Sequence, residues 1–438
     1  MINRNNHMSC CTTSLILLLV FAIANYASAQ SKAADSTRNL RVRRHSPSER
    51  KKKGGKKVKG SYIVTLSDDI SSYNVKELAG KHASKMRDEV KQCIANGVLT
   101  YYNNTQEVQT GRIFTSSIKG FTLTGVPEEL AQSLTDMTGV IAIEEDMTIS
   151  IDDPLEWNQA DGLSDQERHL YEVDTKGDSS CPQLLPWGIQ RIGGPVPNNN
   201  PNGRVFIVDT GIKPSDDLNI DTSLSIDFVN DGSSPAYSDG NGHGTHVAGT
   251  VAAIDNCIGV VGVVPGATLV AVRVLDSQGQ GSLSDVIAGI EYVASKGKSG
   301  DVANLSLGGG VSSTLDAAVL KAAATGIKFA LAAGNSGKDV QYTSPARING
   351  DNIFTVGAID QYDTLCSFSN YGSAVDFAGP GKKIFSLRNG GGIVALSGTS
   401  MATPHIAGLL FANNITADGY AQGVPDSTQQ PIAYVKNS

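Results

Sequence analysis

The sequence predicts an α/β domain with a doubly wound, mostly parallel β-sheet, preceded by a small α+β domain. From residue 183 onwards, short apolar runs alternate with helical patterns, which is the sequence form of a parallel sheet covered by helices. Residues 61–152 instead follow the order strand, helix, two strands, helix, strand, which is typical of a ferredoxin-like unit. The chain of 438 residues, with 40% hydrophobic and 18% charged content, can form both cores.

Residues 1–29 have the pattern of a secretory signal peptide. Arg4 precedes the apolar run 15–24, and Ala27-Ser28-Ala29 is the small-residue end of such a signal. The apolar run is short for a membrane span, and no other segment qualifies as a span or as a lipid-anchor tail. We therefore expect a secreted, extracellular protein with no membrane partner.

Residues 30–60 form a basic leader. Between residues 31 and 60, twelve Lys and Arg stand against two acidic residues, a net of 12 − 2 = +10, although the whole chain carries −7. A basic block without aromatic residues could bind nucleic acid or an anionic membrane. In an exported precursor we expect a solvated, disordered leader and no nucleic-acid partner.

The small domain is expected to span residues 61–152, followed by an acidic, aperiodic linker over 153–182. Hydrophobic periodicity predicts its strands and helices. These are a strand at 62–66, a helix over 75–95, strands near 112–116 and 120–124, a second helix over 127–134, and a last strand at 140–143.

The large domain is expected to span residues 183–438. Predicted strands are Val205–Val208, Leu269–Val274, Val302–Leu307, Lys328–Ala333 and Ile353–Gly357, and predicted helices are His243–Ala252, Leu283–Ser295 and Thr314–Ala324. Ser282 fits a helix N-cap, with Asp285 as the acid in the first turn. Residues 415–438 carry no convincing helical pattern.

A serine in the segment Gly398-Thr399-Ser400 is the first candidate for chemistry. The apolar run 406–411 follows it closely, so its hydroxyl is expected at the N-terminus of a buried helix. The free N–H groups and the positive dipole end at that position favour developing negative charge, which suits a nucleophile. A serine also needs a base and an orienting acid. The alternative interpretation is an N-cap serine of an ordinary core helix.

Two partners for that serine lie upstream. Asp209 ends the apolar run 205–208, at the C-terminal end of a predicted strand, where sites gather in such sheets. His243 opens a small-residue helix after a polar, glycine-containing loop. Taken singly, the Asp could be a turn former and the His a packed core residue. The chain order Asp, His, Ser, with these flanks, is one of the known orders of a catalytic triad.

On these motifs, residues 183–411 resemble the subtilisin family of serine peptidases, the subtilases. The resemblance implies a serine endopeptidase that acts on proteins and peptides, with a subtilisin-like fold. In such an enzyme Asp209 orients the base, His243 is the base and Ser400 is the nucleophile. His246 shares a helix face with His243, as half of a metal pair would, but corresponds to a packing residue of the family.

The resemblance also assigns the small domain. Residues 61–152 correspond to the family's inhibitory propeptide, which templates folding and then blocks the active site with its C-terminal tail. Self-cleavage is expected near Ile151 or Asp152. Whether the mature chain keeps the acidic linker stays open at this point, and a monomer is expected.

Further residues are implied for the substrate. Asn335 corresponds to the family's oxyanion donor, beside the backbone N–H of Ser400. The run Asn304–Gly310 corresponds to the edge strand that pairs with an extended peptide. The implied substrate-binding residues are Asn241, Ser306, Gly308 and Gly334. Because Ser336 after Asn335 is neutral, we expect broad cleavage after apolar or aromatic residues.

A structural calcium site is implied as well. Its ligands would be the side chains of Gln183, Asp217 and Asn256 and the carbonyl oxygens of Ile254, Ile258 and Val260. Oxygen-only ligands suit Ca²⁺. The alternative is a plain surface loop.

The cysteines and glycosylation sequons complete the expectations. If Gln183 and the loop 254–260 share one ion, Cys181 and Cys257 would lie close enough for a disulfide, and Cys366 would be a packed thiol. Asn-x-Ser/Thr sequons occur at Asn103, Asn304 and Asn414. The one at Asn304 lies on the proposed substrate strand and is expected to be too buried for a glycan.

Three rival functions are considered. One is an exported subtilase-like binding protein without turnover, which the intact Asp209, His243, Asn335 and Ser400 argue against. Another is an acid-active, sedolisin-like peptidase, which would carry Glu where His243 stands. The third is a secreted inhibitor of other subtilases, with the small domain as its active part. A serine-directed fluorophosphonate probe separates them, because only an active peptidase labels at Ser400.

Overall fold

The computed structural model describes residues 57–95, 107–151, 158–159, 183–233 and 235–436. The predicted signal peptide, nearly all of the basic leader, most of the acidic linker, Asp152, Cys181 and the Asn103 sequon lie outside these residues. The described part contains no helix that is long and apolar enough to cross a membrane.

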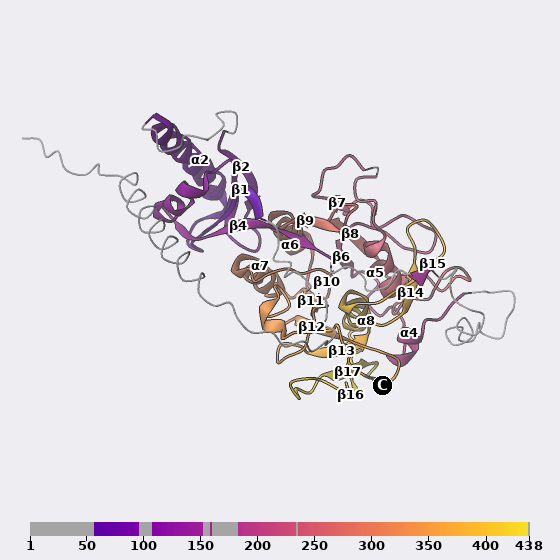
Figure 1. Ribbon diagram of the computed structural model, residues 1–438. Coiled ribbons are helices and arrows are strands. Elements are labelled where there is room, and N and C mark those ends of the chain that lie inside the picture. Colours follow the sequence, from indigo (N-terminus) through magenta and orange to yellow (C-terminus); the bar gives the residue numbers. More distant parts are fainter. Residues whose placement is uncertain (1–56, 96–106, 152–157, 160–182, 234, 437–438) are drawn as a thin grey trace, which may run out of the picture.

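A nine-stranded, mostly parallel sheet is the centre of the large domain (Figure 1). Every neighbouring pair from β7 to β17 is parallel, and only the edge pair of β16 and β17 is antiparallel. The predicted α/β class is therefore confirmed. In spatial order the strands are β16 (Thr416–Tyr420), β17 (Pro431–Tyr434), β13 (Phe377–Pro380), β12 (Ile353–Ile359), β11 (Lys328–Ala332), β10 (Val302–Leu305), β6 (Val205–Asp209), β8 (Leu269–Arg273) and β7 (Ile226–Asp227).

Helices cover both faces of this sheet because its strands are apolar on both faces. Along β6, Val205 and Ile207 face one core, which also holds residues of α5 (His243–Ala252) and α8 (Thr399–Phe411). The alternate residues Phe206 and Val208 face the other core, with α6 (Leu283–Lys296) and α7 (Ser313–Ala323). The period of two in a strand thus sends neighbouring side chains to opposite layers.

The predicted helix cap is present. Ser282 accepts a hydrogen bond from the backbone N–H of Asp285 at 3.0 Å, at the start of α6. The short helix α4 (Trp187–Arg191) has no such side-chain cap and follows Pro186. Sequence patterns did not predict the antiparallel hairpin β14 (Ile384–Leu387) and β15 (Ile393–Leu396), to which β5 (Asn158–Gln159) adds a third strand.

The end of the chain forms strands. No helix was expected beyond residue 415, and β17 instead pairs with β13, while β16 forms the sheet edge. A single residue pair, Ala378 with Ile432, is in register between β13 and β17. Ile432 is buried against Ala378 and Ile359 in a small cluster, so this strand closes the core at that side.

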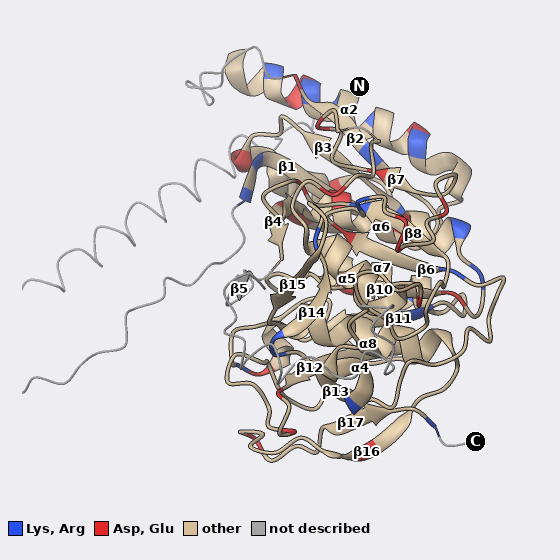
Figure 2. Cartoon of the chain, turned by 90° about the vertical axis from the view of Figure 1, so that its right-hand side faces the viewer, with Lys and Arg blue, Asp and Glu red and all other residues tan. Residues whose placement is uncertain are grey.

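The small domain folds as an antiparallel sheet with a helix packed on it. Its spatial strand order is β2-β3-β1-β4, the order of a ferredoxin-like unit, and α2 (Ser72–Ala95) covers one face (Figure 1). Figure 2 shows charges of both signs along α2, which lies on the side away from the large domain. The strands are β1 (Lys57–Leu66), β2 (Gln109–Phe114), β3 (Gly120–Thr124) and β4 (Val140–Ser150).

Three boundaries of the small domain differ from expectation. β1 begins at Lys57, inside the predicted leader, because it continues to pair with β4. The second predicted helix is a 3₁₀ segment over Glu128–Asp136, whose N-cap Pro127 makes no side-chain cap. Short helical pieces commonly adopt this tighter form. β4 extends to Ser150, seven residues beyond its prediction, because it leaves its own domain and pairs with β9 (Gln280–Ser282) of the large one.

Candidate active site

Asp209 is the last residue of β6. Apolar residues fill the rest of that strand, so the carboxylate at its end is carried into the interior, where it is 0% exposed. Gly211, two residues on, has φ 105°, a left-handed conformation that glycine adopts without strain. The chain therefore turns sharply away just after Asp209.

His243 begins α5 and faces this carboxylate. Its Nδ1 lies 2.8 Å from Oδ1 and 3.0 Å from Oδ2 of Asp209, and both side chains are fully buried. With Nδ1 as the donor, Nε2 is the basic nitrogen of the ring. The structure thus brings together two residues that are 34 positions apart in the chain.

Ser400 lies in the first turn of α8, the helix that packs against α5. Its hydroxyl donates to the carbonyl oxygen of Ser306 at 3.1 Å, and the Ser306 hydroxyl donates back to the Ser400 carbonyl oxygen at 2.9 Å. The N-cap of α8 is Gly398, so the alternative of Ser400 as an ordinary N-cap serine is wrong. The buried hydroxyl at this helix start is oriented by the strand segment after β10.

Asn335 follows β11 and is held by the segment before Ser400. Its Oδ1 accepts hydrogen bonds from the backbone N–H of Thr399 at 2.8 Å and from the Thr399 hydroxyl at 3.0 Å. That hydroxyl also accepts from the N–H of Gly334 at 3.0 Å. Because Oδ1 is engaged by donors, the amide orientation is set and Nδ2 faces the other way. A Cβ on Gly398 would lie 3.1 Å from this nitrogen, a tight contact, so Gly398 lets the two segments approach closely.

The end of the small domain runs into this region as an extended strand. Residues Thr148–Ser150 pair antiparallel with β9, and Ser150 also bridges to Gly308 on the other side. The N–H of Ile151 donates to the carbonyl of Gly279 at 3.0 Å. Gly308 is two residues after Ser306, whose carbonyl accepts the Ser400 hydroxyl. The chain that ends the small domain therefore lies between two strands beside the candidate nucleophile.

Two isoleucines of this strand are buried by the large domain. Ile149 and Ile151 are 1% and 6% exposed. Both pack against glycines: a Cβ on Gly309 would lie 2.7 Å from the Ile149 side chain, and one on Gly279 would lie 2.6 Å from that of Ile151, so either Ile would have to shift. Asn241 lies next to this region, where its Nδ2 donates to the Ser277 carbonyl at 3.2 Å.

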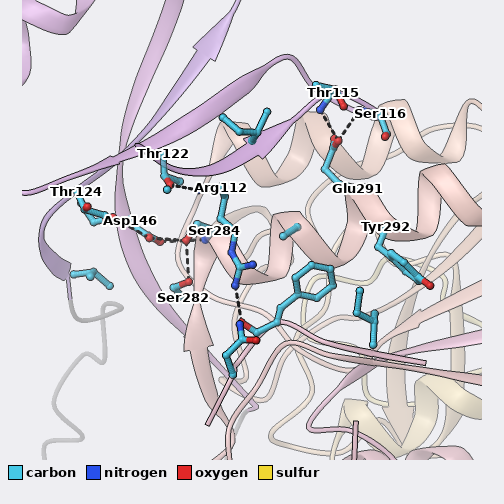
Figure 3. Close-up of a pocket in the computed structure, with 18 of the residues that line it drawn as sticks. Arg112, Thr115, Ser116, Thr122, Thr124, Asp146, Ser282, Ser284, Glu291 and Tyr292 are labelled. Atoms are coloured by element: carbon cyan, nitrogen blue, oxygen red, sulfur yellow. Dashed lines mark hydrogen bonds between the residues drawn. The ribbon is translucent and has the colours of Figure 1, made fainter. Parts of the chain in front are cut away.

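A second contact between the domains is centred on α6. Glu291 accepts hydrogen bonds from four consecutive backbone N–H groups, those of residues 115–118, at 2.5–2.9 Å. Figure 3 shows the first two of them, from Thr115 and Ser116. Asp146 of β4 accepts from the N–H and the hydroxyl of Ser284 at 3.1 and 2.7 Å. Arg112 forms an ion pair with Asp285, and its Nη2 donates to the Phe228 carbonyl at 2.6 Å. Burial raises the pKa of Asp146 above its ordinary value, against the lowering effect of the Ser284 and Ser61 hydrogen bonds.

The other two histidines of the core helices are neutral packing residues. Burial lowers the pKa of His246 to about 3 and that of His405 to about 4. His246 Nε2 contacts the Ile384 carbonyl at 2.9 Å, and His405 Nδ1 contacts the Met401 carbonyl at 2.9 Å. No cluster of three or more His, Cys, Asp or Glu residues occurs in the described part of the chain, so His246 is not half of such a site there.

The predicted calcium ligands gather at one loop. Gln183 Nε2 lies 2.6, 2.8 and 2.9 Å from the carbonyl oxygens of Ile254, Ile258 and Val260. An amide nitrogen has two hydrogens, so three converging acceptors exceed what it can satisfy. Asp217 is buried beside this loop, and within the described residues neither of its carboxylate oxygens accepts a hydrogen bond of normal geometry.

This excess of oxygen acceptors fits a hard cation. Asn256 fits less directly, since its Oδ1 accepts from the Ile258 N–H at 3.1 Å and its Nδ2 donates to the Asp216 carbonyl. A plain surface loop would leave the buried Asp217 carboxylate unexplained, because burying an unpaired carboxylate is costly.

The described cysteines divide as follows. Cys93 and Cys366 are buried, and burial raises the pKa of Cys366 to about 12, as expected of a packed thiol. Cys257 is exposed in the loop next to Gln183, but its predicted disulfide partner, Cys181, lies outside the described residues. Asn304 is fully buried and Asn414 is partly exposed, so of these two sequons only Asn414 is accessible.

Residues that sequence reasoning missed surround the triad. Thr210 donates to Asp209 and to Asp239. Asp239 also accepts from Gly242, directly before His243. Thr399 donates twice to Asn335. The available signal was their position: Thr210 and Thr399 are direct neighbours of predicted residues, and Asp239 begins the polar loop before His243.

Comparison with known proteins identifies the family. The sequence model of the subtilase family matches residues 202–413. Subtilisin BL of Lederbergia lenta is 45% identical over 232 residues, which is 52% of this chain and 82% of that protein. The thermostable alkaline protease of Halalkalibacterium halodurans is 43% identical over 250 residues, 56% of this chain and 66% of that protein.

A solved structure agrees with these sequence relatives. The crystal structure of a cold adapted subtilisin-like serine proteinase has a TM-score of 0.50 and 36% sequence identity, and the match covers 58% of this chain and 99% of that one. The chain therefore belongs to the subtilase family and is a subtilisin-like serine protease.

Proposed function

We propose that this protease cleaves peptide bonds through an acyl-enzyme formed on Ser400, with His243 as the base and Asp209 as its orienting acid. The observation that carries the proposal is the fully buried Asp209–His243 contact of 2.8 Å at the start of α5, next to α8, the helix with Ser400 in its first turn. The carboxylate keeps the Nδ1–H tautomer and stabilises the imidazolium that forms when the ring takes the Ser400 proton. The same proton then goes to the leaving amine.

The oxyanion of the tetrahedral intermediate is stabilised by donors at the start of α8. Asn335 supplies one through Nδ2, because Thr399 engages its Oδ1. The backbone N–H of Ser400 supplies another, and the positive end of the α8 dipole adds to both. These groups are already in place before the reaction, so little reorganisation is needed as charge develops.

Residues 61–152 serve as an inhibitory propeptide. Supporting this, β4 ends as an extended strand between β9 and Gly308, which is where a peptide substrate would add by strand pairing. Self-cleavage near Ile151 or Asp152 would leave the propeptide bound, since the contacts of Glu291, Asp146 and Arg112 do not depend on the scissile bond.

Specificity is proposed to be broad, with apolar or aromatic residues preferred before the scissile bond. The burial of Ile149 and Ile151 against glycines supports apolar recognition further along the strand. Ser336, the residue after Asn335, is neutral, so it gives the pocket for the residue before the scissile bond no charge that would select a basic side chain. Substrates are proteins and peptides.

A structural Ca²⁺ is proposed at the loop 254–260. Asp217 and the carbonyls of Ile254, Ile258 and Val260 would hold it, with Gln183 and Asn256 completing the set. When bound, the cation would neutralise the buried carboxylate and tie the segment before α4 to the loop after α5. A Cys181–Cys257 disulfide would reinforce the same tie.

We further propose a secreted monomer that carries a glycan at Asn103 or Asn414 and is made as a zymogen. The signal-like residues 1–29 support export.

The test of the proposed chemistry is Ser400→Ala, with a fluorophosphonate probe. The substituted precursor is expected to lose peptide hydrolysis and labelling, and to stay uncut between Met147 and Cys181, because self-cleavage uses the same hydroxyl. Intact mass and labelling are read by mass spectrometry. Normal maturation of purified Ser400→Ala precursor, with no other protease present, would falsify self-processing, and retained hydrolysis would remove Ser400 from the nucleophile role.

A further inference from the structure

A buried carboxylate outside α5 holds the start of that helix. Asp239 is 4% exposed, and its two oxygens accept from both sides of the helix start. Oδ1 accepts from the N–H of Asn241 at 2.9 Å and of Gly242 at 2.8 Å. Oδ2 accepts from the N–H of Thr245 at 2.9 Å and from the Thr245 hydroxyl at 2.6 Å. The residue that carries the imidazole, His243, lies between these two pairs of donors.

The same carboxylate is connected to the other member of the buried pair through Thr210. The Thr210 hydroxyl donates to Asp239 Oδ1 at 2.9 Å and accepts from the N–H of Gly244 at 3.0 Å. The backbone N–H of Thr210 donates to Asp209 Oδ1 at 2.7 Å. One threonine therefore contacts the orienting acid, the first turn of the helix and Asp239.

These outside groups are needed because the helix has no side-chain cap of its own. Its N-cap is Gly242, with φ 114°, which lets the chain turn but has no side-chain acceptor, and among the described residues the Asn241 Oδ1 accepts only the N–H of His243, at 3.2 Å. Free N–H groups at a helix start require acceptors, and a carboxylate there also interacts well with the helix dipole. The fit is close: a Cβ on Gly244 would lie 2.1 Å from the Gly211 carbonyl, so the first turn lies directly against the turn after Asp209.

We propose that Asp239 is a positioning residue of this protease. It sets the distance and angle between the His243 ring and Asp209 by fixing the start of α5 and, through Thr210, the turn after β6. The inference rests on the proposed triad. It adds that the alignment of His243 depends on a carboxylate that touches neither substrate nor the reacting atoms.

Substitutions at both ends of this connection test the inference. Asp239→Asn keeps the shape but presents an NH₂ group to N–H donors on one side. Thr210→Val removes only the hydroxyl, without changing charge, and Thr210→Ser restores it. Asp301→Asn is the matched control, since Asp301 is equally buried and accepts only the backbone N–H groups of Arg204 and Lys298, before β10 at the opposite end of the sheet.

Each precursor is matured with immobilised wild-type enzyme, and active sites are counted by complete fluorophosphonate labelling. For Asp239→Asn and Thr210→Val we expect kcat to fall about 10–100-fold, because small misplacements of catalytic groups cost about that much, with KM changed less than twofold. Thr210→Ser should regain most of the kcat that Thr210→Val loses. The acid limb of the kcat/KM profile should move to lower pH in both deficient variants, because a misaligned Asp209 stabilises the imidazolium less.

A merely structural role gives a different result. Asp301→Asn is expected to lower the melting temperature while kcat per labelled site and the acid limb stay at wild-type values. The same pattern in Asp239→Asn would overturn the inference. If Asp239→Asn does not fold, Thr210→Val decides alone: a wild-type kcat and acid limb overturn the inference, and a reduced kcat with a shifted limb supports it. Ser400→Ala is measured alongside, and activity in that variant would show that the triad proposal, not this inference, has failed.

Discussion

At the scale of single residues, the surroundings of each histidine decide its chemistry. Three histidines lie fully buried in α5 and α8. His246 and His405 face backbone carbonyls, and burial holds the pKa of each well below its ordinary value, so both stay neutral. Only His243 faces a carboxylate, which can stabilise the imidazolium that a base becomes. The sequence alone does not distinguish these three histidines by their surroundings. Their contacts do, and they single out His243 as the one that can act as a base.

The oxyanion donor can be tested by one substitution. Asn335→Leu is expected to lower kcat by about 10²–10³-fold with little change in KM, the loss known for the oxyanion-hole asparagine of subtilisin itself. The reason is that Nδ2 stabilises charge only as the intermediate forms. Steady-state kinetics on a chromogenic peptide give both constants.

Its control is Asn200→Leu, which removes a single hydrogen bond to the Gly300 carbonyl at the far end of the sheet. That variant is expected to keep wild-type kcat. A loss in Asn335→Leu that appears only in KM would assign Asn335 to substrate docking instead.

At the scale of elements, β4 joins the two domains. Its first part pairs with β1 inside the small domain, and its last three residues pair with β9 of the large one. Next to it, Glu291 on α6 satisfies four consecutive N–H groups of the turn between β2 and β3. A strand and a helix side chain thus attach the small domain at two places, and the second is independent of the active site.

Glu291→Gln tests the second attachment. The amide loses one acceptor and places an NH₂ group against backbone donors, and hydrogen bonds to a charged group contribute about 1.5–3 kcal/mol. We expect the cleaved propeptide to be released about 10–100-fold faster. The measurement is the lag before peptidase activity appears after self-cleavage of the full precursor.

Glu77→Gln is the control, because Glu77 is an exposed residue of α2 that pairs only with Lys81. Its lag should match the wild type. An unchanged lag in Glu291→Gln would show that the strand contact alone retains the propeptide.

At the scale of the whole molecule, a few long-range ties close the large domain. Val260 pairs with Leu184, which brings the segment before α4 onto the loop after α5, and β17 closes the opposite edge at Ala378. The first of these contacts contains the excess of carbonyl acceptors around Gln183 and the buried Asp217 carboxylate, which accepts no hydrogen bond from the described residues. Its stability is therefore expected to depend on a cation.

Calcium should raise the melting temperature of the matured enzyme, and Asp217→Ala should abolish this response. A ligand that binds only the folded state adds about 2.7 kcal/mol at a hundred times its Kd. Thermal unfolding is followed by circular dichroism in chelator and in millimolar Ca²⁺, with the active site blocked by fluorophosphonate.

Asp216→Ala is the matched control, since Asp216 is the exposed neighbour of Asp217. It should keep the full response to calcium. A wild-type melting temperature that is the same in chelator and in calcium would mean that no cation stabilises the fold.

By itself, the sequence determined the α/β class and the order of most elements, and it named Asp209, His243, Asn335 and Ser400 as the candidate catalytic residues. Each of these lies in a local pattern: an apolar strand that ends in an acid, a glycine loop that opens a helix, or a serine before an apolar helix. Short-range periodicity and turn chemistry are enough to detect such patterns.

Only the tertiary structure decided the rest. The hydrogen bond of Thr210 to Asp239 spans 29 positions, and that of Thr115 to Glu291 spans 176. The extension of β4 onto β9 and the acceptors gathered around Gln183 likewise join segments far apart in the chain. Such contacts leave no periodicity along the sequence, because each of them joins groups from segments that are far apart in the chain. The sequence therefore points to the candidate catalytic groups, and the packing of distant segments decides how those groups are held.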